Sequence, residues 1–246
     1  MSPEVAVKID KLNFSYNGES ILNGLNIRVF SGEIFVIIGP SGSGKSTLLK
    51  LSAGLFYPKN GDVEIKGINV HKAPKDSIQN LRRNMGFVFQ DAALISNTCI
   101  YDNVALPLRY HTSLSESEIE KMVSEKLDLL HIDRSYYYFL PAQLSLGLKR
   151  SVGVARALVI EPDIVFFDEM TASFDSQTIQ KISMIIKDLK NLKVTSIIVT
   201  GDASLAYSIA DRIAIMKNGK IIETGTPDEI RNSQNPDVIL MTSMNK

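Results

Sequence analysis

Short apolar runs recur along the chain, and longer amphipathic stretches separate them. The runs are rich in Val, Ile and Phe, which is typical of parallel strands buried on both faces of a sheet. The amphipathic stretches have the period of the helices that cross over between such strands. The pattern therefore predicts an α/β core whose strands lie at residues 34–38, 86–89, 164–167, 196–199 and 212–216.

Two further pairs of strands are predicted to be antiparallel, because an Asn-Gly dipeptide lies between the members of each pair. Asn and Gly tolerate the positive φ angles of a two-residue hairpin turn. The first pair, residues 5–14 and 21–29, flanks Asn17-Gly18, and the second, 213–217 and 220–224, flanks Asn218-Gly219.

Two long segments have the apolar period of an amphipathic helix. Residues 115–132 begin with the Ser and Glu of a capping box at positions 115 and 118. Their apolar face consists of Ile119, Met122, Val123, Leu127 and Leu130. The second segment, residues 176–189, has an apolar stripe that consists of Ile179, Ile182, Ile186 and Leu189. Such a stripe favours packing against the core over contact with a cofactor.

The position of the first helix, between two predicted core strands, indicates a helical insertion. We expect one domain, residues 1–246. Its α/β core and N-terminal antiparallel β subdomain comprise 1–90 and 156–230, its helical subdomain 91–155 and its C-terminal tail 231–246.

Composition narrows the function classes. The 246 residues are 44% hydrophobic, enough for a sizeable core, and the net charge of zero gives no electrostatic argument for binding nucleic acid. The single cysteine, Cys99, is predicted to pack as a small apolar residue, and a chain without disulfides suits a reducing cytosol. We find no pattern of a secretory signal and no apolar run long enough to span a membrane.

The segment after the strand at 34–38 carries the most specific chemistry. It reads Gly-Pro-Ser-Gly-Ser-Gly-Lys-Ser-Thr and matches the pattern G-x-x-x-x-G-K-[ST]. Glycines let backbone N–H groups approach a phosphate, while the lysine lies against the β- and γ-phosphates and the serine after it binds Mg²⁺. The predicted helix at 47–53 adds a favourable N-terminus. The expected ATP-binding residues here are Gly39, Ser41, Gly42, Ser43, Gly44, Lys45, Ser46 and Thr47.

Two acids end the apolar strand at 164–167. Asp168 is placed to hold Mg²⁺, and Glu169 to orient or deprotonate an attacking water. Many strands end in solvated acids, so the pair gains its meaning from the phosphate-binding pattern upstream.

Taken together, the order of these motifs resembles the ATPases of ABC transporters over nearly the whole chain. The resemblance implies a P-loop NTPase (RecA-like) fold and further site residues: Tyr16 on the adenine, Gln90 sensing Mg²⁺ and water, Ser145 and Gly147 within Leu-Ser-Leu-Gly-Leu, and Asp175 in the loop 173–175. It also implies that two cassettes, as a homo- or heterodimer, bind two ATP molecules between them at the cytoplasmic face of the inner membrane. Separate transmembrane permease subunits are the implied partners. Each of these residues also has a purely structural interpretation. Tyr16 could be an aromatic residue of a strand, Gln90 could cap a loop, and Ser145 and Asp175 could be N-caps of helices.

A closer resemblance is to the ATPases of mammalian-cell-entry (MCE) lipid transporters, the Mla-like systems. It rests on residues 89–94, 101–109, His111-Thr112 and 235–238. It implies a lipid cargo and an MCE-domain partner. Cassettes for amino acids, lipoproteins or cell division share parts of this pattern.

Departures from the family pattern bear on activity. Residues 200–202 read Thr-Gly-Asp where the family has Thr-His-Asp, so Gly201 replaces a histidine that contacts the γ-phosphate. Leu146 replaces a glycine, Leu148 a polar residue, and Ser151 a common arginine. These changes predict either a slow ATPase or one half of an asymmetric dimer.

Three interpretations remain. The first is a transport ATPase, which the acid at position 169 favours. The second is a nucleotide-gated clamp that regulates a membrane complex with little hydrolysis, which Gly201 and Leu146 favour. The third, a soluble DNA-repair or translation cassette, lacks the coiled-coil insertion or tandem cassette expected of that class.

Overall fold

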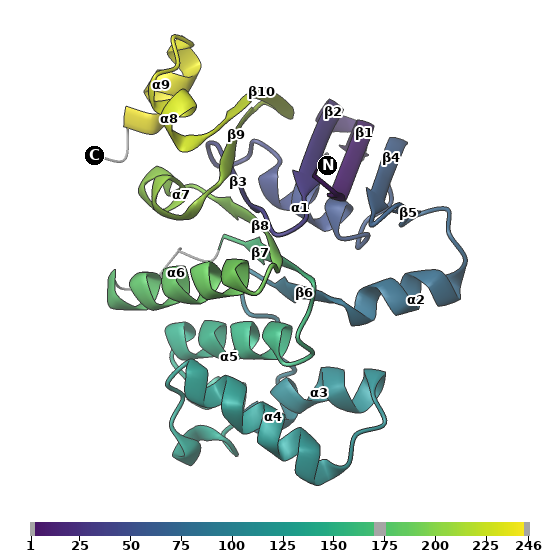
Figure 1. The fold of residues 1–246 in the computed structure, drawn as a ribbon, viewed down its shortest axis with the longest axis vertical. Helices are drawn as coiled ribbons and strands as arrows, with labels where there is room; N and C mark the ends of the chain where they lie inside the picture. The colour runs from purple at the N-terminus through teal and green to yellow at the C-terminus, as the bar shows by residue number, and fades with distance from the viewer. Residues whose placement is uncertain (1–2, 170–175, 244–246) are drawn as a thin grey trace.

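The computed structural model describes residues 3–169 and 176–243, and in them the chain forms two sheets with helices around them (Figure 1). The smaller sheet is antiparallel and has the order β2-β1-β4-β5. Its strands are β1 (Val5–Tyr16), β2 (Glu19–Phe30), β4 (Asn60–Ile65) and β5 (Ile68–Asn69). The predicted hairpin around Asn17-Gly18 is confirmed, and β4 and β5 extend the sheet beyond it.

The larger sheet has the order β10-β9-β3-β8-β7-β6, in which β10 alone is antiparallel to its neighbour. Its strands are β3 (Ile34–Ile38), β6 (Met85–Val88), β7 (Ile164–Asp168), β8 (Thr195–Thr200), β9 (Arg212–Lys217) and β10 (Lys220–Gly225). The five predicted core strands and the second hairpin are confirmed. The prediction for β6 was one residue too late, because its ladder with β7 ends at Val88.

The helices lie around both sheets. They are α1 (Lys45–Ser52), α2 (Lys75–Arg83), α3 (Ile100–His111), α4 (Glu116–Leu129), α5 (Leu146–Leu158), α6 (Ser176–Asn191), α7 (Ala203–Ile209), α8 (Pro227–Arg231) and α9 (Pro236–Ser243). The capping box of α4 is confirmed, since Glu118 and Ser115 bond reciprocally. The helix predicted at 47–53 begins two residues earlier, at Lys45, because Gly44 adopts φ +99° and serves as its N-cap.

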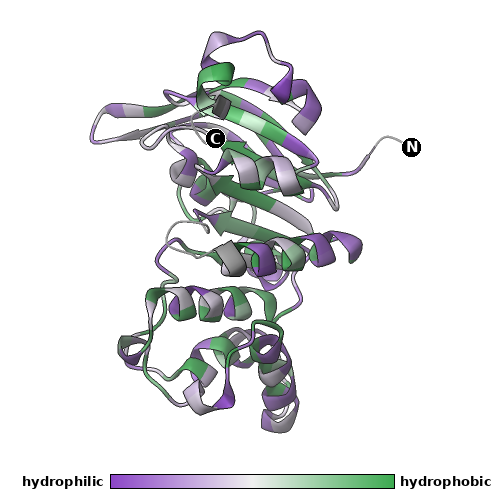
Figure 2. Cartoon of the chain, turned by 90° about the vertical axis from the view of Figure 1, so that its left-hand side faces the viewer, coloured by the Kyte–Doolittle hydropathy of each residue, from purple (hydrophilic) through white to green (hydrophobic). Residues whose placement is uncertain are grey.

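Strand β3 lies at the centre of the core, and all five of its residues are buried. Phe35 and Ile37 pack against α1 and the small sheet. Ile34, Val36 and Ile38 pack on the opposite face, against the helices there. Figure 2 shows the hydrophobic colouring of the central strands and the hydrophilic outer faces of the helices. The loop that follows β3 is therefore anchored in the core.

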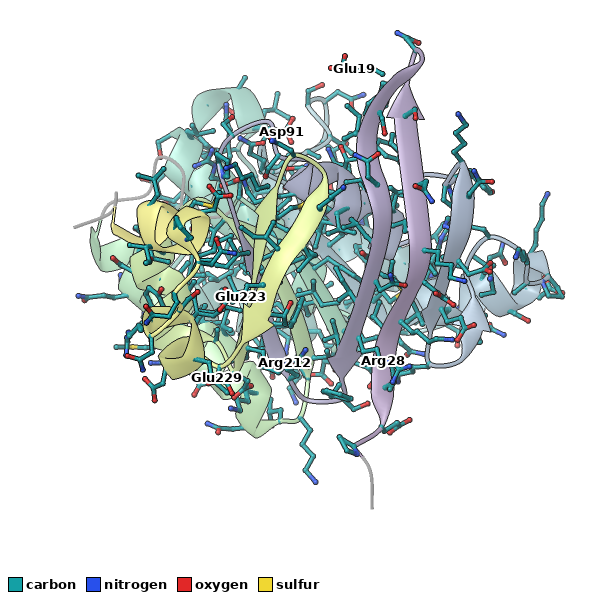
Figure 3. The ribbon with its side chains drawn as sticks, turned by 90° about the horizontal axis from the view of Figure 1, so that it is seen from above. Glu19, Arg28, Asp91, Arg212, Glu223 and Glu229 are labelled. Atoms are coloured by element: carbon teal, nitrogen blue, oxygen red, sulfur yellow. The ribbon has the colours of Figure 1, made fainter. Side chains whose placement is uncertain are left out.

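One arginine joins the two sheets. The guanidinium of Arg212 donates to Glu33 Oε1 at 3.0 Å and to the carbonyl of Arg28 at 3.2 Å. Figure 3 labels Arg212 and Arg28. Burial raises the pKa of Glu33, and the neighbouring Arg212 opposes that rise. This contact lies where β9 approaches the β1–β2 hairpin.

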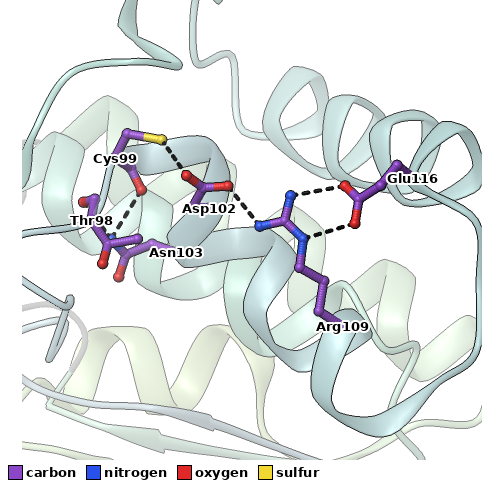
Figure 4. A network of polar contacts seen from close by, with 6 residues as sticks. All are labelled: Thr98, Cys99, Asp102, Asn103, Arg109 and Glu116. Atoms are coloured by element: carbon purple, nitrogen blue, oxygen red, sulfur yellow. Dashed lines mark hydrogen bonds and ion pairs between the residues drawn. The ribbon is translucent and has the colours of Figure 1, made fainter.

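Helices α3, α4 and α5 share an apolar cluster of their own. On its surface, Arg109 of α3 bonds Asp102 at 2.7 Å and Glu116 of α4 at 2.9 Å (Figure 4). The thiol of Cys99 donates to Asp102 Oδ2 at 3.1 Å, and burial raises the pKa of that thiol. Cys99 is thus half-buried at the start of α3, where it makes a polar contact and is not a member of the apolar cluster.

Among the described residues, no helix combines the length and the apolar character that crossing a bilayer requires.

Candidate functional site

The phosphate loop, defined here as residues 39–46, leaves the end of β3 and enters α1. A Cβ at Gly39 would lie 2.1 Å from the carbonyl oxygen of Met216, so no larger residue fits there. Gly42 and Gly44 have φ +77° and +99°, which other residues rarely adopt. The glycines of the pattern therefore allow both the close packing and the turn that bring backbone N–H groups to the start of a helix.

Lys45 is the charged group of this loop. Its side chain is 5% exposed, and Nζ donates to the carbonyls of Gly39 at 2.9 Å and Pro40 at 3.1 Å. Nζ also lies 3.2 Å from Glu169 Oε1. The lysine thus contacts the loop and the acid together, and an anion on the loop would compete for its ammonium group.

Asp168 ends β7 and is 1% exposed. Its Oδ1 is buried and has no hydrogen-bond partner in the part of the chain that the structure describes. Its Oδ2 lies 3.8 Å from Nζ of Lys50 on α1. A buried carboxylate oxygen without a partner fits a divalent cation that takes oxygen ligands.

Glu169 follows with φ +47°, a strained angle for a non-glycine residue. Its N–H donates to the carbonyl of Val199 at 3.0 Å, and its Oε2 accepts from the N–H of Gly201 at 3.3 Å. The carboxylate is therefore held between Lys45 and Gly201, at the edge where β7 and β8 end.

These groups surround one cavity of about 560 Å³. Its lining comprises Tyr16, Ile21, Gly39, Ser41, Gly42, Gly44, Lys45, Ser46, Thr47, Gln90, Glu169 and Gly201. Most of the residues expected to bind ATP are thus brought together. Ser43 and Asp168 are buried directly behind this lining, 4% and 1% exposed.

Two residues of the lining were not expected as site residues. Ile21 enters because β2 pairs with β1 beside Tyr16, and Gly201 enters through its backbone at the end of β8. An apolar residue just after a hairpin turn carries no sequence signal for a site. The sequence singled out Gly201 only as the replacement of a histidine, and gave no sign that its backbone N–H would reach the cavity.

Tyr16 lies at the mouth of the cavity and is 45% exposed. Its ring packs edge-on against Phe14, with centroids 4.7 Å apart, and against Phe56 at 6.2 Å. The aromatic group that the family resemblance assigns to adenine is therefore present and accessible at this end.

Gln90 lies two residues beyond β6, because this strand ends at Val88 and not at the predicted residue 89. It reaches the cavity from the loop that leads to α3. Its carbonyl accepts a hydrogen bond from Nε of Arg150 at 3.0 Å.

The Ser145 segment, defined as residues 144–148, lies elsewhere. Ser145 caps α5, its Oγ accepting from the N–H of Leu148 at 3.3 Å, as predicted. Neither Ser145 nor Gly147 is among the residues that line the cavity. Leu146 is 45% exposed. Asp175 and the rest of its predicted loop, 173–175, lie outside the described residues.

A magnesium ion fits this donor set. The described residues contain no cluster of three or more His, Cys, Asp or Glu side chains, so no all-protein cage is present in them. Mg²⁺ in phosphate sites commonly uses one or two protein oxygens together with phosphate oxygens and water. Asp168 supplies a buried free oxygen, and Ser46 supplies a hydroxyl beside the cavity.

Comparisons with known proteins agree with this arrangement. A family model described as ABC transporter matches residues 22–172. MlaF of Haemophilus influenzae, an intermembrane phospholipid transport ATP-binding protein, is 35% identical over 95% of this chain and 88% of its own length. CysA of Mesostigma viride, a sulfate/thiosulfate import ATP-binding protein, is 38% identical over 92% of this chain and 63% of its own length. The chain thus spans less than two thirds of that relative.

A solved structure agrees over a similar span. The dimeric ATP-binding cassette MJ0796, in a post-hydrolysis state with ADP and Pi, is 32% identical with a TM-score of 0.85, covering 90% of this chain and 98% of its own. The α/β fold with its parallel core and antiparallel β subdomain is therefore shared as a whole. On the matched family model, the two relatives and this structure, the chain belongs to the ABC transporter family.

Proposed function

We propose that the chain is the ATP-binding and ATP-hydrolysing subunit of a transporter whose membrane-spanning subunits are separate chains. The cavity at the phosphate loop carries this proposal, because a lysine, two acids and the start of a helix converge on it. ATP is the substrate, its phosphates on the loop and its adenine near Tyr16.

The catalytic steps belong to few side chains. Lys45 leaves Glu169 and the loop carbonyls and turns to the β- and γ-phosphates. Ser46, Asp168 and Gln90 would hold Mg²⁺, which when bound would neutralise charge that develops on the phosphoryl group. Glu169, released from Lys45, orients water for attack in line with the leaving ADP.

Hydrolysis is expected to be slow. The N–H of Gly201 reaches Glu169, but this residue has no side chain to contact the γ-phosphate. A positioned acid or base group contributes about 10²–10⁴-fold in rate. The rival candidate, a nucleotide-gated clamp on a membrane complex, draws its support from the same glycine and from Leu146.

The Glu169→Gln variant discriminates between the two candidates. We expect the wild-type protein, reconstituted with its membrane subunits, to release phosphate from Mg·ATP at least about 100-fold faster than this variant, since a positioned base is removed. Equal release by the two proteins favours the clamp. Glutamine keeps the size of the side chain, so binding of Mg·ATP serves as the internal control for folding.

A second ATPase subunit completes the proposed ATPase dimer at the cytoplasmic face of the inner membrane. The dimer is proposed to contact a permease that spans this membrane. The Ser145 segment is proposed to meet the nucleotide of the second subunit, because it lies away from the chain's own cavity. A groove near Gln90, lined by Phe89, Leu106 and Pro107 among others, is proposed for the permease. Closure of the dimer on ATP would move this groove.

A lipid cargo with an MCE-domain partner is the finer part of the proposal. The 35% identity to MlaF over 95% of the chain supports it, together with the MCE-like motifs of the sequence. The neighbouring genes test it: genes for an MCE-domain protein and a permease are expected beside this one. A gene for a soluble sulfate-binding protein there would contradict it.

A further inference from the structure

The loop between β6 and α3 has an unusual backbone at Ala92 and Ala93. Both have positive φ angles, +64° and +44°, although neither is glycine. Ala92 is fully buried. Two consecutive alanines persist in this conformation only where their surroundings hold them.

Two arginines of α5 hold this backbone. Arg150 Nε donates to the carbonyl of Gln90 at 3.0 Å. Arg156 donates through two nitrogens, to the carbonyl of Ala92 at 2.7 Å and to that of Ala93 at 2.8 Å. The flat guanidinium fits this task because its N–H groups point in parallel at neighbouring acceptors.

The helix approaches the loop closely between these arginines. Gly153 lies three residues from each of them and so on the same face of α5. A Cβ at Gly153 would lie 3.3 Å from both Cα and Cβ of Ala92. Burial lowers the pKa of Arg156. Its guanidinium is therefore partly withdrawn from water while it donates to the loop, and such hydrogen bonds are strong.

We propose that Arg150 and Arg156 are positioning residues that fix Gln90 in the nucleotide cavity and tie it to α5. This inference rests on the proposed function, because it takes Gln90 as part of the Mg·ATP site. Helix α5 begins at the Ser145 segment and passes the loop with Arg150, Gly153 and Arg156.

The test is a double-mutant cycle on nucleotide affinity, with Mg·AMP-PNP, a non-hydrolysable ATP analogue, titrated by calorimetry. We expect Arg156→Met, which keeps the aliphatic stem, and Gln90→Ala each to weaken binding about tenfold. If the arginine acts through Gln90, the double variant is no weaker than the worse single variant. Arg156→Lys, with one donor group for two carbonyls, is expected to lie between wild type and Arg156→Met.

Arg109→Gln is the matched control, because Arg109 also bridges parts of the helical layer but contacts neither the loop nor the cavity. Its affinity should stay within about twofold of wild type. The inference is overturned if the losses of affinity in the two single variants multiply in the double variant. It is also overturned if Arg156→Met binds Mg·AMP-PNP as tightly as the wild-type protein. If Arg156→Met does not fold, the same cycle is run with Arg156→Lys. Absence of binding by the wild-type protein refutes the proposed function instead, and the inference with it.

Discussion

The phosphate-loop edge of the sheet and the Ser145 segment differ in how completely a single chain builds them. At the edge, Lys45 and Asp168 are buried, Glu169 is half-buried, and all three already contact protein groups. The Ser145 segment caps its helix and carries an exposed Leu146, yet it lies outside the cavity. In the proposed function, the first region needs only nucleotide and metal, whereas the second needs a second subunit before it can face a phosphate.

This difference assigns separate consequences to substitutions in the two regions. Changes at the edge should alter binding and turnover directly. Changes in the Ser145 segment should leave nucleotide binding to the single chain intact and alter association of the chains.

The largest expected effect is at the metal-binding acid. Asp168→Asn should lower Mg²⁺-dependent turnover by about 10³-fold, because metal stabilisation of a phosphoryl-transfer transition state amounts to several kcal/mol. The measurement is phosphate release as a function of Mg²⁺ concentration. Asp163→Asn is the matched control, since Asp163 precedes the same strand and pairs with Lys66 at 2.5 Å on the surface. Equal losses in both variants would refute a metal role for Asp168.

The second-largest expected effect is at Gly201, where the family has a histidine. No atom of the described residues 3–169 and 176–243 lies within 4 Å of a Cβ built at Gly201, so a side chain fits against them. Gly201→His should raise turnover by about 100-fold, the low end of the contribution of a positioned acid or base group. Gly201→Ala, which adds the Cβ without a ring, should leave it unchanged. If the histidine variant is no faster, another group already fills this role.

Substitution of Leu146 should act on association. Leu146→Gly is expected to strengthen Mg·ATP-driven dimerisation about tenfold by removing bulk from the approach to the partner's nucleotide. Light scattering with a Glu169→Gln background, which traps ATP, measures it. Leu146→Ala keeps helix propensity and should show part of the gain. Leu192→Ala, at a site 75% exposed, controls for loss of a surface apolar group. Weaker dimers in Leu146→Gly would contradict the crowding argument.

The smallest effect concerns the polar contacts of Arg109. Its hydrogen bond lowers the pKa of Asp102 from 3.8, so the stabilisation is present above that pH and is lost as the pH falls through the lowered value. Arg109→Gln should lower Tm by about 2 °C at pH 7, and the difference should shrink as the pH falls below 3.8. Arg134→Gln, whose side chain is 76% exposed, should shift Tm less. A difference that persists in acid would show that packing, not charge, is responsible.

How much could be read from the sequence depended on how local each signal was. Strand β3 and the phosphate loop were predicted because an apolar run and a spaced set of glycines lie within a few residues. Strand β4 was not, since it contains Gly61 and Asp62 and is defined by pairing with distant β1. Helix α3 was not predicted, and one reason is that Pro107 lies inside it.

The site followed the same rule. The identity of its charged residues was predictable, but their contacts were not. The approach of Lys45 to Glu169 depends on β3 and β7 both pairing with β8. The hydrogen bonds from Arg150 and Arg156 end on backbone carbonyls, which every residue has, so no spacing of side chains could indicate them.

Calorimetric titration of the purified chain with Mg·ATP tests the central claim most directly, with Lys45→Ala as the comparison. The account predicts binding by the wild-type protein and a loss of about 100-fold in the variant, because a charge-assisted contact to the phosphates is removed. No heat with the wild-type chain, or equal affinity in the two proteins, would contradict it.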